Sequence, residues 1–277
     1  MNPTTTSELR TLGKTAASVE AFSLGGEGIL RTTGREREAV PMILRALELG
    51  VRYCDTAPAY ASSQDYYGAA FRAAAGAREK LTLATKTHHR GYDGALRLLD
   101  DSLKRLGTTY VAVWQMHDLR DQDDLDQLSA KSGALAAAER AKADGRVRFI
   151  GLTGHHDPAI LLLAMRRYAF DTVLMPTNPA DPRRAPFLTT VLPEARKQGM
   201  GVIGMKALAV GRIPQDGVAR ADELIRYAAS FADTVIVGCS SPAEVEQNLA
   251  TARTAAPFGE GEARALEARV AAQAHRY

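Results

Sequence analysis

The chain has 277 residues, of which 45% are hydrophobic and 24% charged, with a formal net charge of +3 at pH 7. This composition provides enough apolar side chains for a large core and an ordinary soluble surface. Basic residues are scattered, with no cluster longer than pairs such as Arg183-Arg184 or the Arg-Glu-Arg segment Arg35 to Arg37, which argues against a nucleic-acid-binding protein. We expect one domain that spans residues 1–277, because α/β barrels often reach this length as a single domain.

The N-terminal segment is polar and lacks the apolar stretch of a secretory signal, and no later segment approaches the ~18 apolar residues of a membrane span. We therefore expect a cytoplasmic protein with no membrane partner. Cys54 and Cys239 lie in apolar runs without a CxxC-type neighbour, so we expect buried, reduced thiols and no zinc or iron–sulfur site built on them.

Short apolar runs rich in Val, Ile and aromatic residues recur along the chain. Such unbroken runs are typical of parallel strands that are covered on both faces. Eight are expected, at 19–24, 51–55, 81–85, 111–116, 147–153, 172–176, 201–206 and 234–238.

Amphipathic segments separate these runs. In 94–107, Leu96, Leu99, Leu103 and Leu106 follow a helical spacing, and Gly107 provides the stop. The other expected helices are 36–49, 65–75, 131–144, 157–168, 187–199, 219–231 and 242–253, with a ninth near 260–275. The regular alternation of strand and helix predicts a (β/α)8 TIM barrel, and we expect a short N-terminal β-hairpin before it.

Four polar residues follow successive expected strands. Asp55 ends the second strand and Tyr60 lies in the loop after it, while Lys86 ends the third strand and His117 follows the fourth. Barrel enzymes carry their chemistry at these strand ends, so we expect the four side chains to meet there.

A tyrosine can act as an acid or base if its pKa is adjusted, and an adjacent ammonium group lowers that pKa. Lys86 is the candidate neighbour, and the Asp55 carboxylate would keep it charged. His117 could orient a substrate oxygen or relay a proton. Each residue alone also has a purely structural interpretation, but the set of four points to catalysis.

The chain resembles the aldo-keto reductases, a family of (β/α)8 barrels that reduce carbonyl groups with a nicotinamide cofactor. The similar stretches are "RTLGKTAASVEAFSLGGEG", "YCDTAPAY", "LATKT", "DSLKRLGTTYVAVWQMHDL", "GRVRFIGLTGH" and "TVIVGCSSPAEVEQNL". The resemblance implies that Tyr60 is the general acid, that Lys86 and Asp55 set its pKa, and that His117 orients the carbonyl. It also implies an NAD or NADP cofactor, a small-molecule carbonyl substrate, and Gly26 at the cofactor site.

The nicotinamide side departs from the family pattern. After the fifth strand, where the family usually has Ser-Asn, this chain has Thr153-Gly154. After the sixth strand, where the family usually has Gln, this chain has Leu174, with Asn178 nearby. The segment after the seventh strand is expected to contact the cofactor through Met205, Lys206, Ala207 and Leu208. Met205 stands where an aromatic residue commonly stacks on the ring. Ala61 replaces the glycine that usually follows the tyrosine.

The resemblance places the adenosine end of the cofactor at "GCSSPAEVEQN". Backbone amides after Ser240 and Ser241 would suit a phosphate, and Asn248 would face the adenine. Glu244 replaces the frequent arginine and would repel a 2′-phosphate, which shifts the expectation toward NAD. Arg212 and Arg253 are alternative partners for a 2′-phosphate, although each also fits a solvated surface arginine.

Two other functions stay open at this point. His88-His89 and His155-His156 follow the third and fifth strands and could bind zinc in a barrel hydrolase, although adjacent histidines usually point apart. A non-catalytic, redox-sensing nicotinamide-binding barrel is the other alternative. The C-terminal segment is short, so we expect an open pocket, and the sequence does not predict the substrate.

Overall fold

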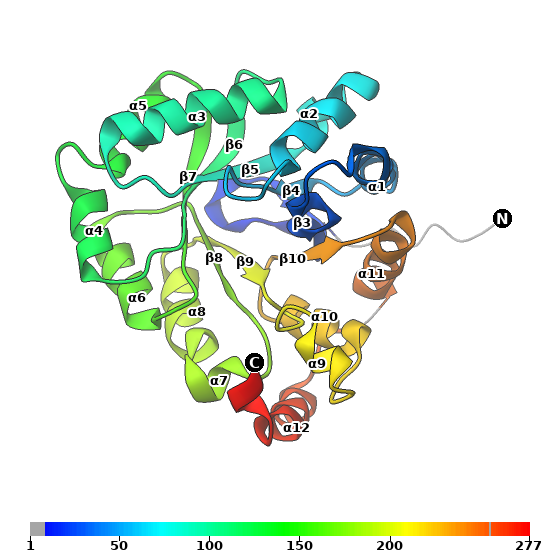
Figure 1. Cartoon of the computed structure of the whole chain (residues 1–277). Helices are drawn as coiled ribbons and strands as arrows, with labels where there is room; N and C mark the ends of the chain where they lie inside the picture. Colours follow the sequence, from blue (N-terminus) through cyan, green and yellow to red (C-terminus); the bar gives the residue numbers. More distant parts are fainter. Residues whose placement is uncertain (1–8, 255) are drawn as a thin grey trace.

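Eight parallel strands close into a barrel in the order β10-β3-β4-β5-β6-β7-β8-β9 (Figure 1). The computed structural model describes residues 9–254 and 256–277. The strands are β3 (Phe22–Gly28), β4 (Tyr53–Asp55), β5 (Thr82–Thr87), β6 (Val111–Met116), β7 (Val147–Thr153), β8 (Thr172–Pro176), β9 (Gly201–Met205) and β10 (Thr234–Cys239). The predicted (β/α)8 barrel is confirmed, and every predicted strand overlaps one of these.

Helices surround the barrel on its outer side (Figure 1). They are α1 (Glu36–Glu48), α2 (Ser63–Ala73), α3 (Tyr92–Leu106), α4 (Gln122–Ser129), α5 (Ala134–Ala143), α6 (Pro158–Arg167), α7 (Asp181–Arg184), α8 (Phe187–Lys197), α9 (Arg212–Gln215), α10 (Ala221–Ala229), α11 (Pro242–Thr254) and α12 (Glu260–Ala271). Short 3-10 helices are η1 (Gly13–Thr15), η2 (Ile29–Arg31), η3 (Arg78–Lys80) and η4 (Ala274–Arg276). In the described ranges no helix is both long and apolar enough to cross a membrane.

The amphipathic pattern of α3 explains how these helices attach to the barrel. Leu99, Leu103 and Leu106 are buried on its inner side, as their helical spacing predicts. Gly107 ends the helix with a left-handed φ of 64°, a conformation that glycine adopts without a steric penalty.

The sequence did not predict α4, α7 or α9. In α4 only Leu125 and Leu128 are buried, which is too short an apolar pattern to reveal a helix. The helix begins because the Asp121 side chain accepts a hydrogen bond from the Asp124 N–H at 2.9 Å.

A two-stranded antiparallel hairpin, β1 (Arg10–Thr11) and β2 (Ser18–Val19), closes the end of the barrel where the strands begin. Its Leu12 and Val19 are fully buried and pack into the barrel interior with Tyr53 and Ile203. A β-carbon on Gly13 would lie 2.1 Å from the Gly201 nitrogen, so this close approach requires glycine. The opposite end of the barrel, where the strands finish, carries the polar residues of the predicted site.

Candidate active site

Asp55 and Lys86 form a fully buried ion pair at the ends of β4 and β5. The Lys86 ammonium group donates to the Asp55 carboxylate and, at 2.9 Å, to the carbonyl oxygen of Thr56. Burial alone would lower the pKa of Lys86, but the Asp55 carboxylate and Tyr60 raise it above its ordinary value. Lys86 therefore remains a fixed positive charge at the floor of the site.

Tyr60 lies directly against this charge. The Lys86 Nζ is 4.6 Å from the centroid of the Tyr60 ring. Burial raises the pKa of Tyr60, and although Lys86 lowers it, the net pKa stays above its ordinary value of 10.0. The expected lowering by Lys86 is present, but burial outweighs it. The phenol keeps its proton at neutral pH.

His117 completes the group from the end of β6. Its ring meets the Tyr60 ring edge-on, with centroids 5.8 Å apart and planes at 84°. Burial, followed by the positive charge of Lys86, lowers the pKa of His117 to about 3. The imidazole is neutral at physiological pH, which suits the orientation of a substrate oxygen better than proton relay. The four predicted residues thus lie together at one place.

Two small residues determine how Tyr60 sits. A β-carbon on Gly26 would lie 2.4 Å from Tyr60 Cδ2, so the ring packs directly on the β3 backbone at Gly26. Ala61 has a positive φ of 45°, which is unfavourable for a residue with a side chain. This geometry gives a physical reason for the glycine that is usual at position 61 in the family pattern.

Two arginines near the site have no clear signal in the sequence. The Arg31 guanidinium carbon lies 5.3 Å from the Tyr60 ring centroid, on η2 after β3. Arg90 donates to the carbonyl oxygens of His117 and Asp118 at 2.8 and 3.0 Å. It also forms an ion pair with Asp124 at 2.9 Å, so it fixes the backbone that carries His117.

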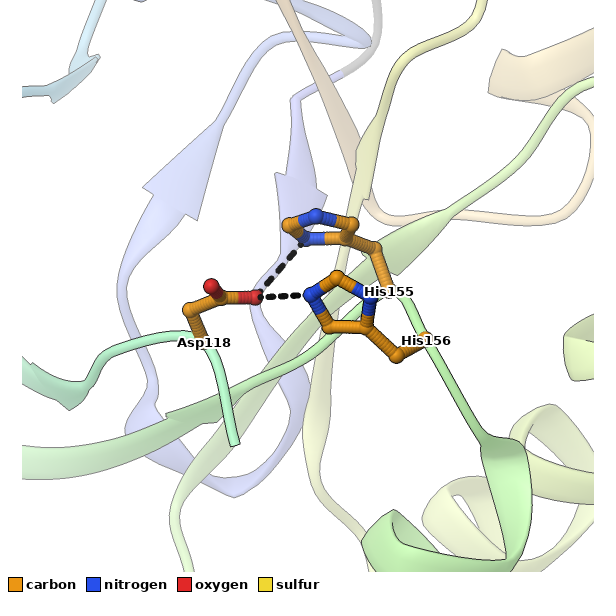
Figure 2. Close-up of side chains that lie close together, drawn as sticks. All are labelled: Asp118, His155 and His156. Atoms are coloured by element: carbon orange, nitrogen blue, oxygen red, sulfur yellow. Dashed lines mark ion pairs between the residues drawn. The ribbon is translucent and has the colours of Figure 1, made fainter. Parts of the chain in front are cut away.

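The two predicted histidine pairs behave differently. His88 and His89 stack on each other, with centroids 5.0 Å apart. His155 and His156 both point at Asp118, each with a ring nitrogen 3.1 Å from its Oδ1 (Figure 2). The expectation that adjacent histidines point apart is wrong here, because the chain bends at these residues after β7 and the alternation of a strand no longer applies.

On the predicted nicotinamide side, the residues are spread over three strand ends. Thr153 is buried at the end of β7, and Leu174 packs inside the barrel rather than at its mouth. Asn178 is also buried, and its side-chain oxygen accepts a hydrogen bond from the Ala180 N–H at 2.9 Å. Met205 is partly buried over the barrel interior.

The segment after β9 lines a cavity of about 390 Å³ at the strand ends. Lys206 is exposed at its wall, and the Asn178 side chain and both histidines of the 155–156 pair also line it. Ala207 is buried and Leu208 is partly buried against the core. Lys206, Ala209 and Val210 all have positive φ angles, an unusual concentration of strain that is typical of ligand-binding loops.

A larger cavity lies elsewhere. It measures about 700 Å³ and is lined by residues of α1, by Gly50 to Arg52 before β4 and by the segment after α2. That place is the end of the barrel where the strands begin, and none of the predicted site residues lines it. Volume alone is therefore a poor guide to the site.

The predicted phosphate site at the start of α11 is already occupied by the protein's own side chains. The Glu244 carboxylate accepts the Ser240 N–H at 2.9 Å, and the Glu244 N–H donates to Ser241 Oγ at 3.3 Å. The expectation of free amides here is therefore wrong in part. The Asn248 amide donates to Cys239 Sγ at 3.4 Å.

The two alternative arginines lie at opposite ends of the barrel. Arg253 donates to the Leu49 carbonyl at 2.6 Å, at the far end of the barrel, so it is a structural residue rather than a phosphate ligand. Arg212 donates to the Arg276 carbonyl at 3.1 Å and lines the cavity of about 390 Å³. Of the two, Arg212 is the one that lies at the end of the barrel with the site.

Comparison with known proteins decides the family. The model of the aldo/keto reductase family matches residues 21–224. The chain belongs to the aldo/keto reductase family. It is therefore an NAD(P)-dependent oxidoreductase, a class whose members act on small carbonyl compounds. This assignment replaces the metal-dependent hydrolase and the non-catalytic module considered from the sequence.

Several relatives resemble the chain over most of its length. L-galactose dehydrogenase of Arabidopsis thaliana is 27% identical over 88% of this chain and 87% of its own. An aldo-keto reductase of Mycobacterium sp. strain KMS is 26% identical over 81% of each chain. An aldo-keto reductase structure from Klebsiella pneumoniae, with NADP and acetate, has a TM-score of 0.76 over 96% of both chains at 20% identity, which shows the shared fold.

Proposed function

We propose that this chain interconverts carbonyl compounds and alcohols, with Tyr60 as the general acid and base. The observation that carries this proposal is the contact of Tyr60 with both the buried Lys86–Asp55 ion pair and the neutral His117 ring. A proton donor, a fixed cation and a neutral hydrogen-bonding ring then face one reacting oxygen.

The residues at the strand ends suit a nicotinamide cofactor. The cavity of about 390 Å³ adjoins them and carries Lys206 and Arg212, whose positive charges suit an anionic pyrophosphate. Thr153 and Asn178 would hold the nicotinamide amide, and Met205 would pack on the face of the nicotinamide ring. The backbone at Ala207 and Leu208 would lie along the pyrophosphate. A bound cofactor supplies or accepts the hydride.

The protein's own residues then handle the proton. In reduction, the Tyr60 hydroxyl donates its proton to the carbonyl oxygen, and Lys86 stabilises the phenolate that remains. Asp55 keeps Lys86 charged and in place. His117, which is neutral, orients the oxygen through a hydrogen bond without competing for the proton.

We further propose that the cofactor is NAD rather than NADP. The Glu244 carboxylate accepts the Ser240 N–H at the start of α11. In the family pattern this position frequently carries an arginine for the 2′-phosphate, so a carboxylate here would repel that phosphate. A Glu244→Gln variant should bind NADPH more tightly and NADH about equally, because only the 2′-phosphate meets the carboxylate. Parallel titrations with NADH and NADPH at matched salt test this, and a wild-type preference for NADPH would overturn it.

An aldose in its cyclic hemiacetal form, which can lose a hydride from C1 and a proton from the C1 hydroxyl to give a lactone, is a reasonable first substrate to test, because one relative similar over 88% of this chain is an L-galactose dehydrogenase. The assay panel should therefore contain L-galactose and other aldoses in the oxidative direction. Simple aldehydes and ketones in the reductive direction complete the panel.

Lys86→Met tests the proposed mechanism. We expect kcat to fall at least about 100-fold, because the phenolate loses its stabilising charge. Lys197→Met, at an exposed side chain, is the matched control. Because Lys86→Met leaves a buried carboxylate unpaired, the Asp55→Asn/Lys86→Met double variant provides a form without that charge. Activity within a few-fold of wild type in either variant would refute the role of Lys86.

A further inference from the structure

Asp118, His155 and His156 form a cluster that the proposed hydride chemistry does not use. One nitrogen from each imidazole and one oxygen of Asp118 all lie within 4.8 Å of one another. Asp118 comes from the loop after β6 and both histidines from the loop after β7, and all three side chains point to one spot (Figure 2).

Asp118 Oδ1 is buried and lies 3.1 Å from a nitrogen of each imidazole, in ion pairs that hold only while the imidazoles are protonated. Among the described residues no hydrogen bond of good geometry reaches this oxygen. With neutral imidazoles the buried carboxylate oxygen would therefore lack a partner, which is costly. For a tetrahedral ion with ligands at about 2.1 Å, neighbouring ligand atoms lie about 3.4 Å apart. The two separations of 3.1 Å between Asp118 Oδ1 and the histidine nitrogens are close to that value, and all three ligand atoms lie within 4.8 Å of one another.

The surrounding residues hold the carboxylate in position. Arg120 donates to the other oxygen, Oδ2, at 2.8 and 2.9 Å, which leaves Oδ1 for the histidines. Arg90 holds the Asp118 carbonyl oxygen at 3.0 Å. The Leu119 N–H donates to the Thr153 carbonyl at 2.8 Å, which ties the two loops together. Such outer contacts are what orient the ligands of protein metal sites.

We propose that Asp118, His155 and His156 bind one zinc ion, or a similar divalent transition metal, at the mouth of the barrel. Two imidazoles and one carboxylate are a ligand set that zinc uses in catalytic sites, where a water or substrate oxygen takes the fourth position. Both histidines line the cavity of about 390 Å³ and are partly exposed, so an ion can enter and its open position faces that cavity.

The inference does not depend on the proposed function. A bound ion would cross-link the loops after β6 and β7 one residue from His117. The ion would therefore mainly stabilise these two loops. Coordination of an oxygen atom of a molecule in the cavity would be a secondary effect.

Titration of metal-free protein with Co²⁺ and Zn²⁺ tests the site, with calorimetry and the visible absorption of protein-bound Co²⁺ as readouts. We expect one ion per chain and a rise in melting temperature of roughly 5 °C when free zinc is about 100 times its Kd. His155→Ala, His156→Ala and Asp118→Asn should each lower affinity by at least about tenfold. The matched control is the His88→Ala/His89→Ala pair, which is also adjacent and follows a strand but has no ion-paired acid among the described residues.

The control variant should keep wild-type affinity and the same Co²⁺ spectrum. Stoichiometric binding that is lost only in the Asp118, His155 and His156 variants supports the site. Absence of binding to wild type, or equal binding by wild type and His156→Ala, would overturn it. His156 is the most exposed ligand, with 44% of its side chain accessible, so its variant is the one that best keeps the fold.

Discussion

Gly26 and Tyr60 are in direct contact: a β-carbon on Gly26 would lie 2.4 Å from Cδ2 and 2.8 Å from Cε2 of the tyrosine ring. The Tyr60 ring therefore packs directly on the backbone of β3, and Lys86 and His117 lie on its other sides. This contact suggests that position 26 controls where the phenol lies.

A Gly26→Ala variant should move the Tyr60 ring and lower kcat by about 100-fold, because a shift near 1 Å has that effect on a reacting group. Cofactor affinity should change less than kcat if the main effect is on the ring. Gly261→Ala in α12 is the control, since a β-carbon there meets nothing within 4 Å. Unchanged turnover in Gly26→Ala would contradict the tight packing of the tyrosine.

The pH dependence of reduction follows from the pKa of Tyr60. Burial raises this pKa above its ordinary value of 10.0, so the phenol is protonated through the neutral range. As a general acid it must carry the proton, so kcat/KM for reduction should be constant through neutral pH and fall as pH rises through the raised pKa. Alcohol oxidation should rise over the same range. A profile of kcat/KM in both directions checks this, and a fall in reduction near pH 7 would contradict it.

Ala61 should be a point of stored strain. Its φ of 45° costs roughly 1–2 kcal/mol for a residue with a side chain, whereas glycine adopts it freely. After the greater entropy of glycine in the unfolded chain is subtracted, Ala61→Gly should raise the free energy of unfolding by up to about 1 kcal/mol. Denaturant titration measures this. Ala265→Gly on the exposed face of α12 should instead lower it by about 1 kcal/mol, and the same sign for both variants would refute the argument.

Both cysteines should be unreactive in the folded protein. Cys54 and Cys239 are free and buried, and burial raises the pKa of each thiol to about 12. The thiolate, which is the reactive form, is therefore almost absent at neutral pH. A chromogenic thiol reagent should label neither in native buffer and both after denaturation. Rapid labelling of native protein would show that one of these regions opens.

The barrel was predictable because parallel strands covered on both faces must be apolar almost throughout, as in Val111–Met116. The four-residue site followed from the same argument, since strand ends at known positions bring Asp55, Tyr60, Lys86 and His117 to one face. Helix α4 was missed because its buried surface depends on two leucines in an acidic segment.

Other features depend on geometry that the sequence does not show. The convergence of His155 and His156 arises from a bend after β7, and the raised pKa of Tyr60 from the degree of its burial. The sequence identified Glu244 as a replacement for a basic residue. Its hydrogen bond with the Ser240 N–H could not be predicted, because it depends on the three-dimensional position of the start of α11. Arg253 was considered for a phosphate because its distance from the site is invisible in the sequence.

Tyr60→Phe provides the most direct test of the central claim. The variant removes one oxygen and keeps the ring that packs on Gly26, so cofactor affinity measured by fluorescence titration should stay within a few-fold of wild type. Single-turnover carbonyl reduction should fall by about 100-fold or more, since the proton donor is gone. Turnover equal to that of wild type, with cofactor still bound, would mean that another group donates the proton and would contradict the account.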